Sequence, residues 1–243
     1  MCRWGVQVGY PYRPIWRVPH GPPELKSGGI HLWRAELNPE AMKALPSLAQ
    51  TLSADELARA GRFHLERDRN RYVLARGALR SILARYLNTT PREPVFRYGP
   101  SGKPELTSGV VRLNLSHADD IVVYAISRAG HVGVDVERVR PGVEKALAAR
   151  LSPAAQRLLE ALPPAARRRV FFQGWTRMEA YAKARGEGVE SGLETFETFL
   201  GDQPRHWYLH DFSPRRGYVG ALATRRGNCR LEYWKWQGEM VAV

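Results

Sequence analysis

Cysteine is scarce in this sequence, and long hydrophobic runs are absent. The only cysteines among the 243 residues are Cys2 and Cys229, which excludes a disulfide framework and a thiolate metal site. No apolar run approaches the length of about 18 residues that spans a bilayer, and no apolar core follows a basic N-terminus. We therefore expect neither export nor membrane insertion, and a reducing cytoplasm is the expected compartment.

Acidic residues are also few compared with basic ones. Lysine and arginine number 37 against 24 aspartates and glutamates, so the formal net charge is +13. A basic surface raises the local concentration of anionic partners. Nucleic acid, a phosphorylated small molecule or an acidic protein would each satisfy this charge, and charge alone does not distinguish them.

The remaining composition is that of a folded globular protein, with 44% hydrophobic and 25% charged residues. Residues 1–30 hold five prolines between Pro11 and Pro23 and are expected to be irregular. Hydrophobic periodicity and capping residues predict the elements beyond this arm. The predicted strands cover residues 31–37, 110–115, 121–126, 132–136, 207–212, 218–224 and 230–236, and the predicted helices cover 53–63, 67–87, 143–150, 153–162 and a tract from 167 to 186.

The order of these elements suggests two similar halves. Each half would contain a strand, a long helical region and a pair of later strands, with the join near Gly130. We predict an α+β fold whose halves, residues 1–129 and 130–243, are related by pseudo-two-fold symmetry. The N-terminal half includes the irregular arm.

A stripe of functional residues is predicted within WTRMEAYAKARGEG, residues 175–188. Trp175, Glu179 and Lys183 follow at intervals of four, so on an α-helix they project from one face. Gly186 and Gly188 are placed to end that helix. The alternative is an amphipathic surface helix with an ordinary Glu–Lys pair.

A second acidic motif is HVGVDVERV, residues 131–139. In a strand, Asp135 and Glu137 share one face while Val134 and Val136 enter the core. The repulsion between the two carboxylates needs a cation, a shared proton or solvent to relieve it. The alternative is an edge strand with a charged outer face.

Two further segments carry groups that could bind an anion. Lys103 stands between Gly102 and Pro104 in RYGPSGKPEL, a predicted turn or loop over residues 97–106. Ser116 and His117 belong to SHADD, predicted as the connection between two strands. The alternatives are a solvated loop charge and a histidine with a structural hydrogen bond.

Two motifs in this order resemble the hallmarks of one enzyme family. They are GVDVE and, about forty residues later, WTRMEAYAKARGEG. They look like the G-x-D-x-E strand and the W-x-x-K-E-x-x-x-K helix of 4'-phosphopantetheinyl transferases of the longer, surfactin-synthetase-activating (Sfp) type. GKPEL from Gly102 and NLSH from Asn114 resemble two more family motifs in the expected order. The resemblance covers residues 52–188 and the later YVGALA strand.

This resemblance implies a reaction and its partners. The 4'-phosphopantetheine arm of coenzyme A would pass to a serine of an apo acyl, peptidyl or aryl carrier protein, releasing 3',5'-ADP. The enzyme would be a monomer that uses Mg²⁺, with Mn²⁺ as the alternative metal. No nucleic acid or membrane partner is expected.

The resemblance also implies a role for each matching residue. Asp135, Glu137 and Glu179 would hold the metal, and Glu179 would accept the serine proton. Lys183 would contact the diphosphate as a second catalytic residue. Coenzyme A phosphates are assigned to Lys103, Ser116, His117 and Arg59.

One position departs from the family pattern. The lysine that usually precedes the helix glutamate is Met178 here, and Arg177 stands one position earlier, where its length could let it reach the same phosphate. Three alternatives stay open: a basic nucleic-acid-binding protein, a metal-dependent phosphodiesterase acting on a coenzyme A-like diphosphate, and a chain that binds coenzyme A but has lost transfer.

Overall fold

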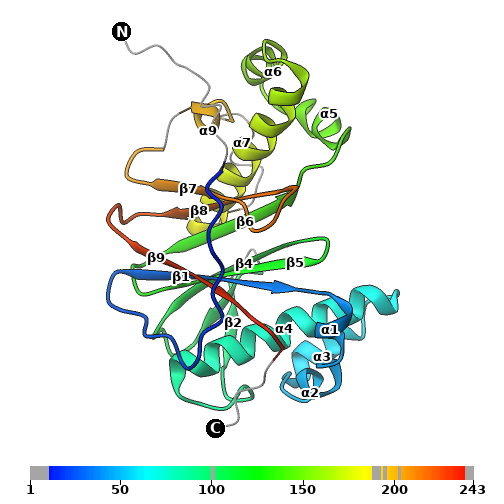
Figure 1. Ribbon diagram of the computed structural model, residues 1–243, viewed down its shortest axis with the longest axis vertical. Coiled ribbons are helices and arrows are strands. Elements are labelled where there is room, and N and C mark those ends of the chain that lie inside the picture. Colours follow the sequence, from blue (N-terminus) through cyan, green and yellow to red (C-terminus); the bar gives the residue numbers. More distant parts are fainter. Residues whose placement is uncertain (1–10, 100–101, 188–192, 194–195, 202–203, 239–243) are drawn as a thin grey trace.

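Two β-sheets form the middle of the protein, and helices gather at its two ends (Figure 1). The structure is a computed structural model, which describes residues 11–99, 102–187, 193, 196–201 and 204–238. The first sheet has the strand order β4-β5-β1-β9, and the second has the order β6-β8-β7. The strands of these two sheets are β1 (Gly29–Glu36), β4 (Arg112–Ala118), β5 (Ile121–Ser127), β6 (Val132–Arg138), β7 (Tyr208–Phe212), β8 (Tyr218–Thr224) and β9 (Arg230–Lys235).

The helices divide between the two ends of the molecule. Those beside the first sheet are α1 (Pro39–Met42), α2 (Leu45–Ala49), α3 (Ala54–Ala60) and α4 (Glu66–Leu87). Those beside the second sheet are α5 (Val143–Ala148), α6 (Pro153–Glu160), α7 (Pro164–Arg185) and α9 (Thr198–Gly201). The two long helices, α4 and α7, have 22 residues each, and each ends where a residue adopts the left-handed conformation, at Asn88 and at Gly186. Gly186 thus ends its helix as predicted, while Gly188 lies outside the described residues.

The two halves share one topology, so the predicted α+β fold with two similar halves is confirmed. In each half a strand leads through a long helix to a hairpin, whose second strand pairs antiparallel with the first strand. The order β4-β5-β1 therefore corresponds to β7-β8-β6.

Two segments cross between the halves. Strand β9 comes last in the chain, yet it pairs in parallel with β1 in the first sheet. The N-terminal arm, dark blue in Figure 1, runs across both sheets and forms bridges from Tyr12 to Phe212 and from Arg17 to Trp234. A division of the chain after residue 129 stays a prediction.

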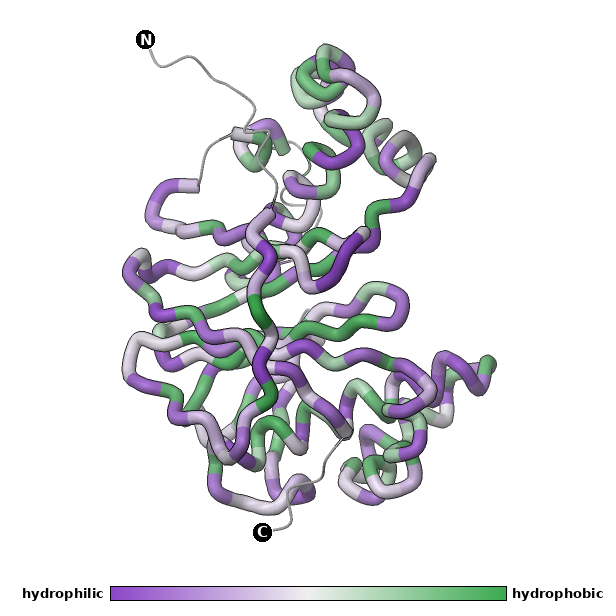
Figure 2. Tube along the Cα trace, in the orientation of Figure 1, coloured by the Kyte–Doolittle hydropathy of each residue, from purple (hydrophilic) through white to green (hydrophobic). Residues whose placement is uncertain are grey.

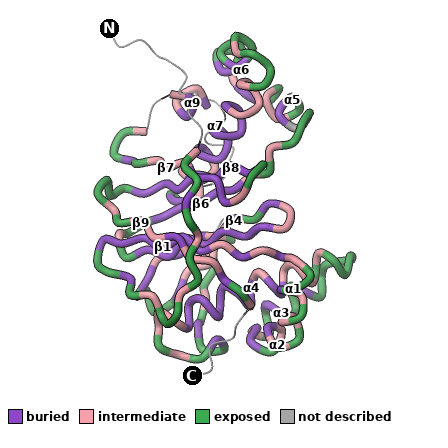
Figure 3. Tube along the Cα trace, in the orientation of Figure 1, coloured by how far each residue is buried: buried purple, intermediate pink, exposed green. Residues whose placement is uncertain are grey.

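The three largest apolar clusters of the core lie along the sheets and the long helices, where hydrophobic residues are green in Figure 2 and buried ones purple in Figure 3. One apolar cluster packs α4 against the first sheet, a second fills the space between the sheets, and a third surrounds α7. Val134 and Val136 belong to the second cluster and are fully buried, which confirms the predicted inner face of this strand.

Two sequence-based expectations need correction. Ser116, His117 and Ala118 belong to β4, so only Asp119 and Asp120 turn the chain into β5. The segment 97–106 is more than a loop, because Phe96–Tyr98 (β2) and Pro104–Leu106 (β3) pair as a short antiparallel hairpin. Within the described residues, none of the helices has the length and apolar character needed to cross a membrane.

Candidate active site

A cleft of about 950 Å³ lies where the two halves meet. Residues of α3, α4, β4 and the β2-β3 hairpin line it from the N-terminal half, and residues of β6 and α7 line it from the C-terminal half. All of the residues predicted for the site are among those that line it: Arg59, Lys103, Ser116, His117, Asp135, Glu137, Glu179 and Lys183.

The acidic wall of the cleft forms because α7 lies unusually close to β6. A Cβ atom at Gly133 would overlap the carbonyl oxygen of Ala180 and the backbone nitrogen of Ala184. Only glycine leaves room for this approach, which explains why a glycine precedes the two acids of the strand. Asp135 and Glu137 on β6 and Glu179 on α7 consequently line one cleft.

Two of the three carboxylates, those of Glu137 and Glu179, bind a proton more readily than usual. Burial, and then the negative charge of Asp135, raise the pKa of Glu137 to about 7. The same two causes raise the pKa of Glu179 to about 7. The acidic wall therefore repels additional negative charge and favours a cation or a proton.

Lys183 supplies a cation to this wall. Its Nζ atom donates hydrogen bonds to Asp135 Oδ1 at 2.6 Å and to Ser116 Oγ at 3.1 Å. Ser116 in turn donates to the same Asp135 oxygen at 2.7 Å. Burial would lower the pKa of Lys183, but the charge and hydrogen bond of Asp135 together with the charges of Glu179 and Glu137 outweigh it, so the pKa is raised and Lys183 is a stable ammonium ion.

The donor set of the acidic wall suits a hard metal ion. Asp135 Oδ2 is buried without a hydrogen-bond partner, and the carboxylates of Glu137 and Glu179 line the same cleft. Mg²⁺ and Mn²⁺ prefer such oxygen ligands. Within the described ranges no three histidine, cysteine, aspartate or glutamate side chains form a ready-made metal cage. The three acids fit the ion by their chemistry, and their role as its ligands stays a prediction.

The other predicted cationic and polar groups lie around this centre. Desolvation, and then the positive charge of Lys183, lower the pKa of His117. The guanidinium of Arg59 lies 5.8 Å from the centre of the Tyr72 ring. Lys103 bonds to backbone carbonyl groups of the C-terminal half, at Lys183 O and Val132 O.

Known families match the chain on both sides of the cleft. The family model described as the 4'-phosphopantetheinyl transferase superfamily matches residues 131–223, and the model described as 4'-phosphopantetheinyl transferase, N-terminal, matches residues 37–129. The 4'-phosphopantetheinyl transferase HetI of Nostoc sp. is 37% identical over an alignment of 230 residues, which covers 88% of this chain and 95% of that protein. The chain belongs to the 4'-phosphopantetheinyl transferase superfamily.

Two further relatives match smaller parts of the chain. The 4'-phosphopantetheinyl transferase psf-1 of Bacillus pumilus is 30% identical over 198 residues, covering 76% of this chain and 84% of that protein. The 4'-phosphopantetheinyl transferase AcpT of Salmonella typhi is 36% identical over 110 residues, covering 44% of this chain and 56% of that protein. None of the families and relatives named here is described as a nucleic-acid-binding protein or a phosphodiesterase.

Met178, which stands where the family pattern has a lysine, lies in the hydrophobic core. Met178 is fully buried in the apolar cluster around α7, together with Trp175, which stacks on Phe171. Arg177 donates to both carboxylate oxygens of Asp211, at 2.8 and 2.5 Å. It does not line the cleft, so the suggestion that Arg177 replaces the family lysine is wrong.

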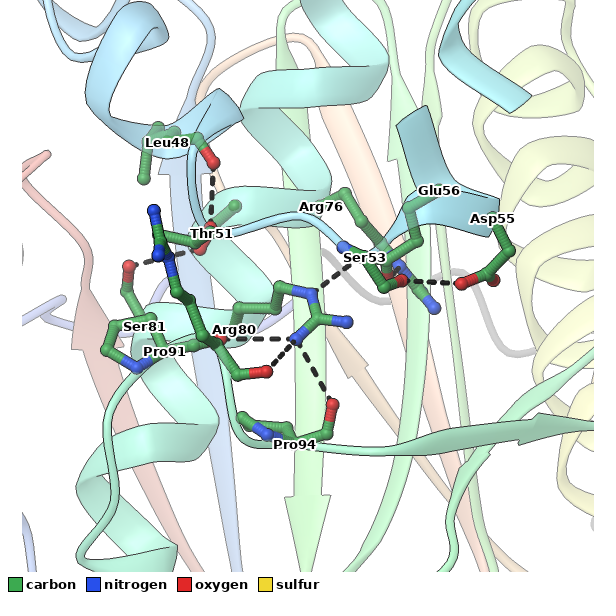
Figure 4. A network of polar contacts seen from close by, with 12 residues as sticks. Leu48, Thr51, Ser53, Asp55, Glu56, Arg76, Arg80, Ser81, Pro91 and Pro94 are labelled. Carbon is green, nitrogen blue, oxygen red and sulfur yellow. Dashed lines mark hydrogen bonds and ion pairs between the residues drawn. The ribbon is translucent and has the colours of Figure 1, made fainter. Parts of the chain in front are cut away.

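Sequence reasoning missed part of the N-terminal wall of the transferase cleft. Arg76 and Tyr98 line it and are joined by a 2.5 Å hydrogen bond from Arg76 Nη2 to the Tyr98 hydroxyl. Glu56, fully buried, accepts from Arg76 Nε at 2.5 Å and from Arg80 Nε at 2.6 Å (Figure 4). Burial would raise the pKa of Glu56, but the two arginines outweigh it and the pKa is lowered.

This arginine network had a partial signal in the sequence. Ser53 and Glu56 form a capping box at the start of α3, which accounts for the glutamate but not for its second role as the partner of two arginines on α4. Arg76 and Arg80 are four residues apart, so they share a helix face. That this face turns inward follows only from the packing of α3 on α4.

Proposed function

We propose that this chain transfers the 4'-phosphopantetheine moiety of coenzyme A to a serine hydroxyl of an apo carrier protein and releases 3',5'-ADP. One observation carries the proposal: the cleft between the halves is lined by Asp135, Glu137 and Glu179, by Lys183 and by further cationic and hydrogen-bonding groups. Membership of the superfamily names the reaction, and this combination of charges suits a substrate with several phosphates.

The reaction requires one bond to form and one to break at phosphorus. The serine oxygen attacks the phosphorus atom that bears the pantetheine arm, and the bond from that phosphorus to the bridging oxygen breaks. Glu179 is our candidate to accept the serine proton, directly or through water. Lys183 is our candidate to compensate the charge that develops on the departing phosphate, and it already faces the acidic wall.

Mg²⁺, or Mn²⁺ in its place, would be held by Asp135, Glu137 and Glu179. When bound, the ion supplies a hard positive charge that neutralises both these acids and the diphosphate oxygens. Supporting this assignment are the unpartnered oxygen of Asp135 and the raised pKa values of the two glutamates.

For the coenzyme A phosphates we propose Arg59, Lys103, Ser116 and His117 as binding residues, since all of them line the cleft. We also propose that the enzyme belongs to the longer, surfactin-synthetase-activating type. Each half of that type would correspond to one half of this chain, divided near residue 130. The enzyme would act as a cytoplasmic monomer, because one chain supplies both walls of the cleft.

Intact-mass spectrometry of a panel of apo carrier proteins tests the proposal. With purified enzyme, coenzyme A and Mg²⁺, at least one acyl, peptidyl or aryl carrier should gain the mass of the phosphopantetheine arm. Chelation of the metal should stop the reaction, and Mg²⁺ or Mn²⁺ should restore it. Unmodified carriers throughout the panel, or cleavage of coenzyme A without a carrier, would contradict the proposal.

A further inference from the structure

Lys103 connects the N-terminal half to two elements of the C-terminal half. Its Nζ atom donates a hydrogen bond of 2.7 Å to the carbonyl oxygen of Lys183 and one of 3.3 Å to the carbonyl oxygen of Val132. The first acceptor lies in the last turn of α7, and the second is the first residue of β6. One side chain therefore links the helix and the strand that carry the acidic wall.

The C-terminal end of α7 is a suitable place for such a cation. The last carbonyl groups of a helix lack partners within it, and the aligned peptide dipoles give this end a partial negative charge. Here the Gly186 amide donates to Lys183 O and the Glu187 amide to Ala182 O. The Lys103 ammonium adds a charged donor to the same turn.

Lys103 is partly buried and has lost much of its water. Burial is the main cause that lowers the pKa of this lysine. An ammonium group without water needs other acceptors, and the two carbonyl oxygens supply them. These contacts therefore hold the lysine in place rather than being incidental to a solvated side chain.

The lysine is also held on its own side of the cleft. Its carbonyl group accepts a 3.0 Å hydrogen bond from the Gly99 amide across the β2-β3 hairpin. Gly102, the residue before it, has a φ of +74°, which glycine adopts without strain. The described residues at the base of this hairpin thus present the ammonium to α7.

The last turn of α7 is the part of the helix that carries Lys183. From this turn the Lys183 side chain reaches Asp135, and Glu179 lies one turn earlier on the same helix. A shift of the turn would move both side chains relative to the strand acids.

We propose that Lys103 is a positioning residue, which clamps the last turn of α7 to the start of β6 and thereby sets where Lys183 and Glu179 lie in the cleft. The kinetic consequence rests on the proposed function, whereas the structural consequence does not. A lysine that served only as a phosphate ligand would affect substrate affinity and leave the ligand-free helix unchanged.

Hydrogen exchange of the ligand-free, full-length protein tests the structural consequence. In Lys103→Met the amides of Gly186 and Glu187 should exchange roughly tenfold faster than in the unaltered chain, because their helix turn loses a charged hydrogen bond. The matched control is Arg97→Met, which removes a positive charge from the same hairpin, where Arg97 pairs with Glu105 and is mostly exposed. Unchanged exchange in Lys103→Met would overturn the proposal.

Steady-state kinetics test the consequence for the reaction. Lys103→Met should lower kcat by about 10- to 100-fold, as expected for misplaced catalytic groups, in addition to the rise in KM for coenzyme A that loss of the proposed phosphate contact would cause. Lys103→Arg, whose guanidinium can still donate to both carbonyl groups, should recover most of the lost kcat and the exchange protection. A raised KM with unchanged kcat in Lys103→Met would overturn the proposal. An unaltered chain that transfers nothing would refute the proposed function, while the exchange measurement would still decide the clamp.

Discussion

Asp135 is the residue at which the charges of the cleft meet. One of its oxygens accepts hydrogen bonds from Lys183 and Ser116, and the other is buried without a partner. Its negative charge contributes to the raised pKa values of Glu137 and Glu179. A buried carboxylate of this kind is stable only beside a cation. In the structure that cation is Lys183.

Replacing Asp135 with asparagine should separate folding from metal-dependent transfer. The amide keeps the shape of the side chain and an acceptor for Ser116, so the chain should remain folded. It lacks the charge that attracts a metal ion, and we expect the transfer rate at fixed Mg²⁺ to fall by at least about 100-fold. Initial rates across a Mg²⁺ titration, with circular dichroism as the folding control, provide the test. A variant with the rate and Mg²⁺ dependence of the original chain would contradict the proposal that Asp135 binds the metal ion.

At the residue scale, side-chain spacing predicted the acidic wall but not the contacts that nearby charged residues make. A period of two in the strand and of four in the helix sufficed to point Asp135, Glu137, Glu179 and Lys183 the same way. Arg177 could not be placed by spacing, because its partner Asp211 is 34 residues away in the chain. The same limit applies to Glu56 and its two arginines, which lie 20 and 24 residues further on.

At the scale of elements, the contact of α7 with β6 determines the geometry of the cleft. Gly133 on the strand and two alanines on the helix, Ala180 and Ala184, bring the two backbones together. These small residues leave no bulky side chain at this contact between the elements that carry Asp135, Glu137 and Glu179. The helix therefore has a defined depth and register against the strand.

Gly133→Ala should force this contact apart. The added methyl group would overlap backbone atoms of α7, which cannot rotate away as a side chain can. We expect a loss of about 3 kcal/mol in the free energy of unfolding, measured by urea denaturation. Gly61→Ala is the control, because its Cβ would lie 3.5 Å from its nearest neighbour, an ordinary contact. Equal stability of the two variants would contradict the packing argument.

The elements themselves were mostly predictable, with errors where polar residues occupy strands. The long helices and the apolar strands have clear periodicity and end at recognisable caps, such as Gly186. The sequence predicts the Ser116-His117 pair in the connection between two strands, because the SHADD segment lies between two β-rich runs. It remains in β4 because Asn114 and Ser116 bond to β6: Asn114 accepts from the Val134 amide at 2.8 Å, and Ser116 from the Val136 amide at 3.4 Å.

At the scale of the whole molecule, the halves are joined by more than the cleft. The side chains of β4 bond to the backbone of β6, the last strand joins the first sheet, and the N-terminal arm touches both sheets. The arrangement of these crossings was not visible in the sequence, because strand periodicity reports burial and not pairing partners. These contacts fix the N-terminal and C-terminal walls of the cleft relative to one another.

Acid should weaken this structure partly through His31, a buried residue of β1. Burial lowers the pKa of His31 to about 4, below the ordinary value of 6.5. As the pH falls below 6.5 the unfolded chain takes up a proton at this histidine before the folded chain does. The free energy of unfolding therefore falls by about 3 kcal/mol between pH 6.5 and pH 4 because of His31.

His31→Gln isolates this contribution to the pH dependence. Glu137 and Glu179, with raised pKa values, act in the opposite direction as the pH falls through this range, so the difference between the variant and the original chain is the relevant quantity. Urea denaturation at several pH values should show a weaker loss of stability toward pH 4 in the variant. Parallel curves for the two proteins would contradict the assignment.

The intact mass of an apo carrier protein tests the central claim most directly. The carrier is incubated with coenzyme A, Mg²⁺ and either the original chain or its Glu179→Gln variant. If the cleft between the halves performs the transfer with Glu179 as the proton acceptor, the original chain adds the phosphopantetheine arm. The variant, still folded and still binding coenzyme A, should do so at least about 100-fold more slowly. Transfer by the variant at the original rate, or no transfer by the original chain to any carrier, would contradict the account.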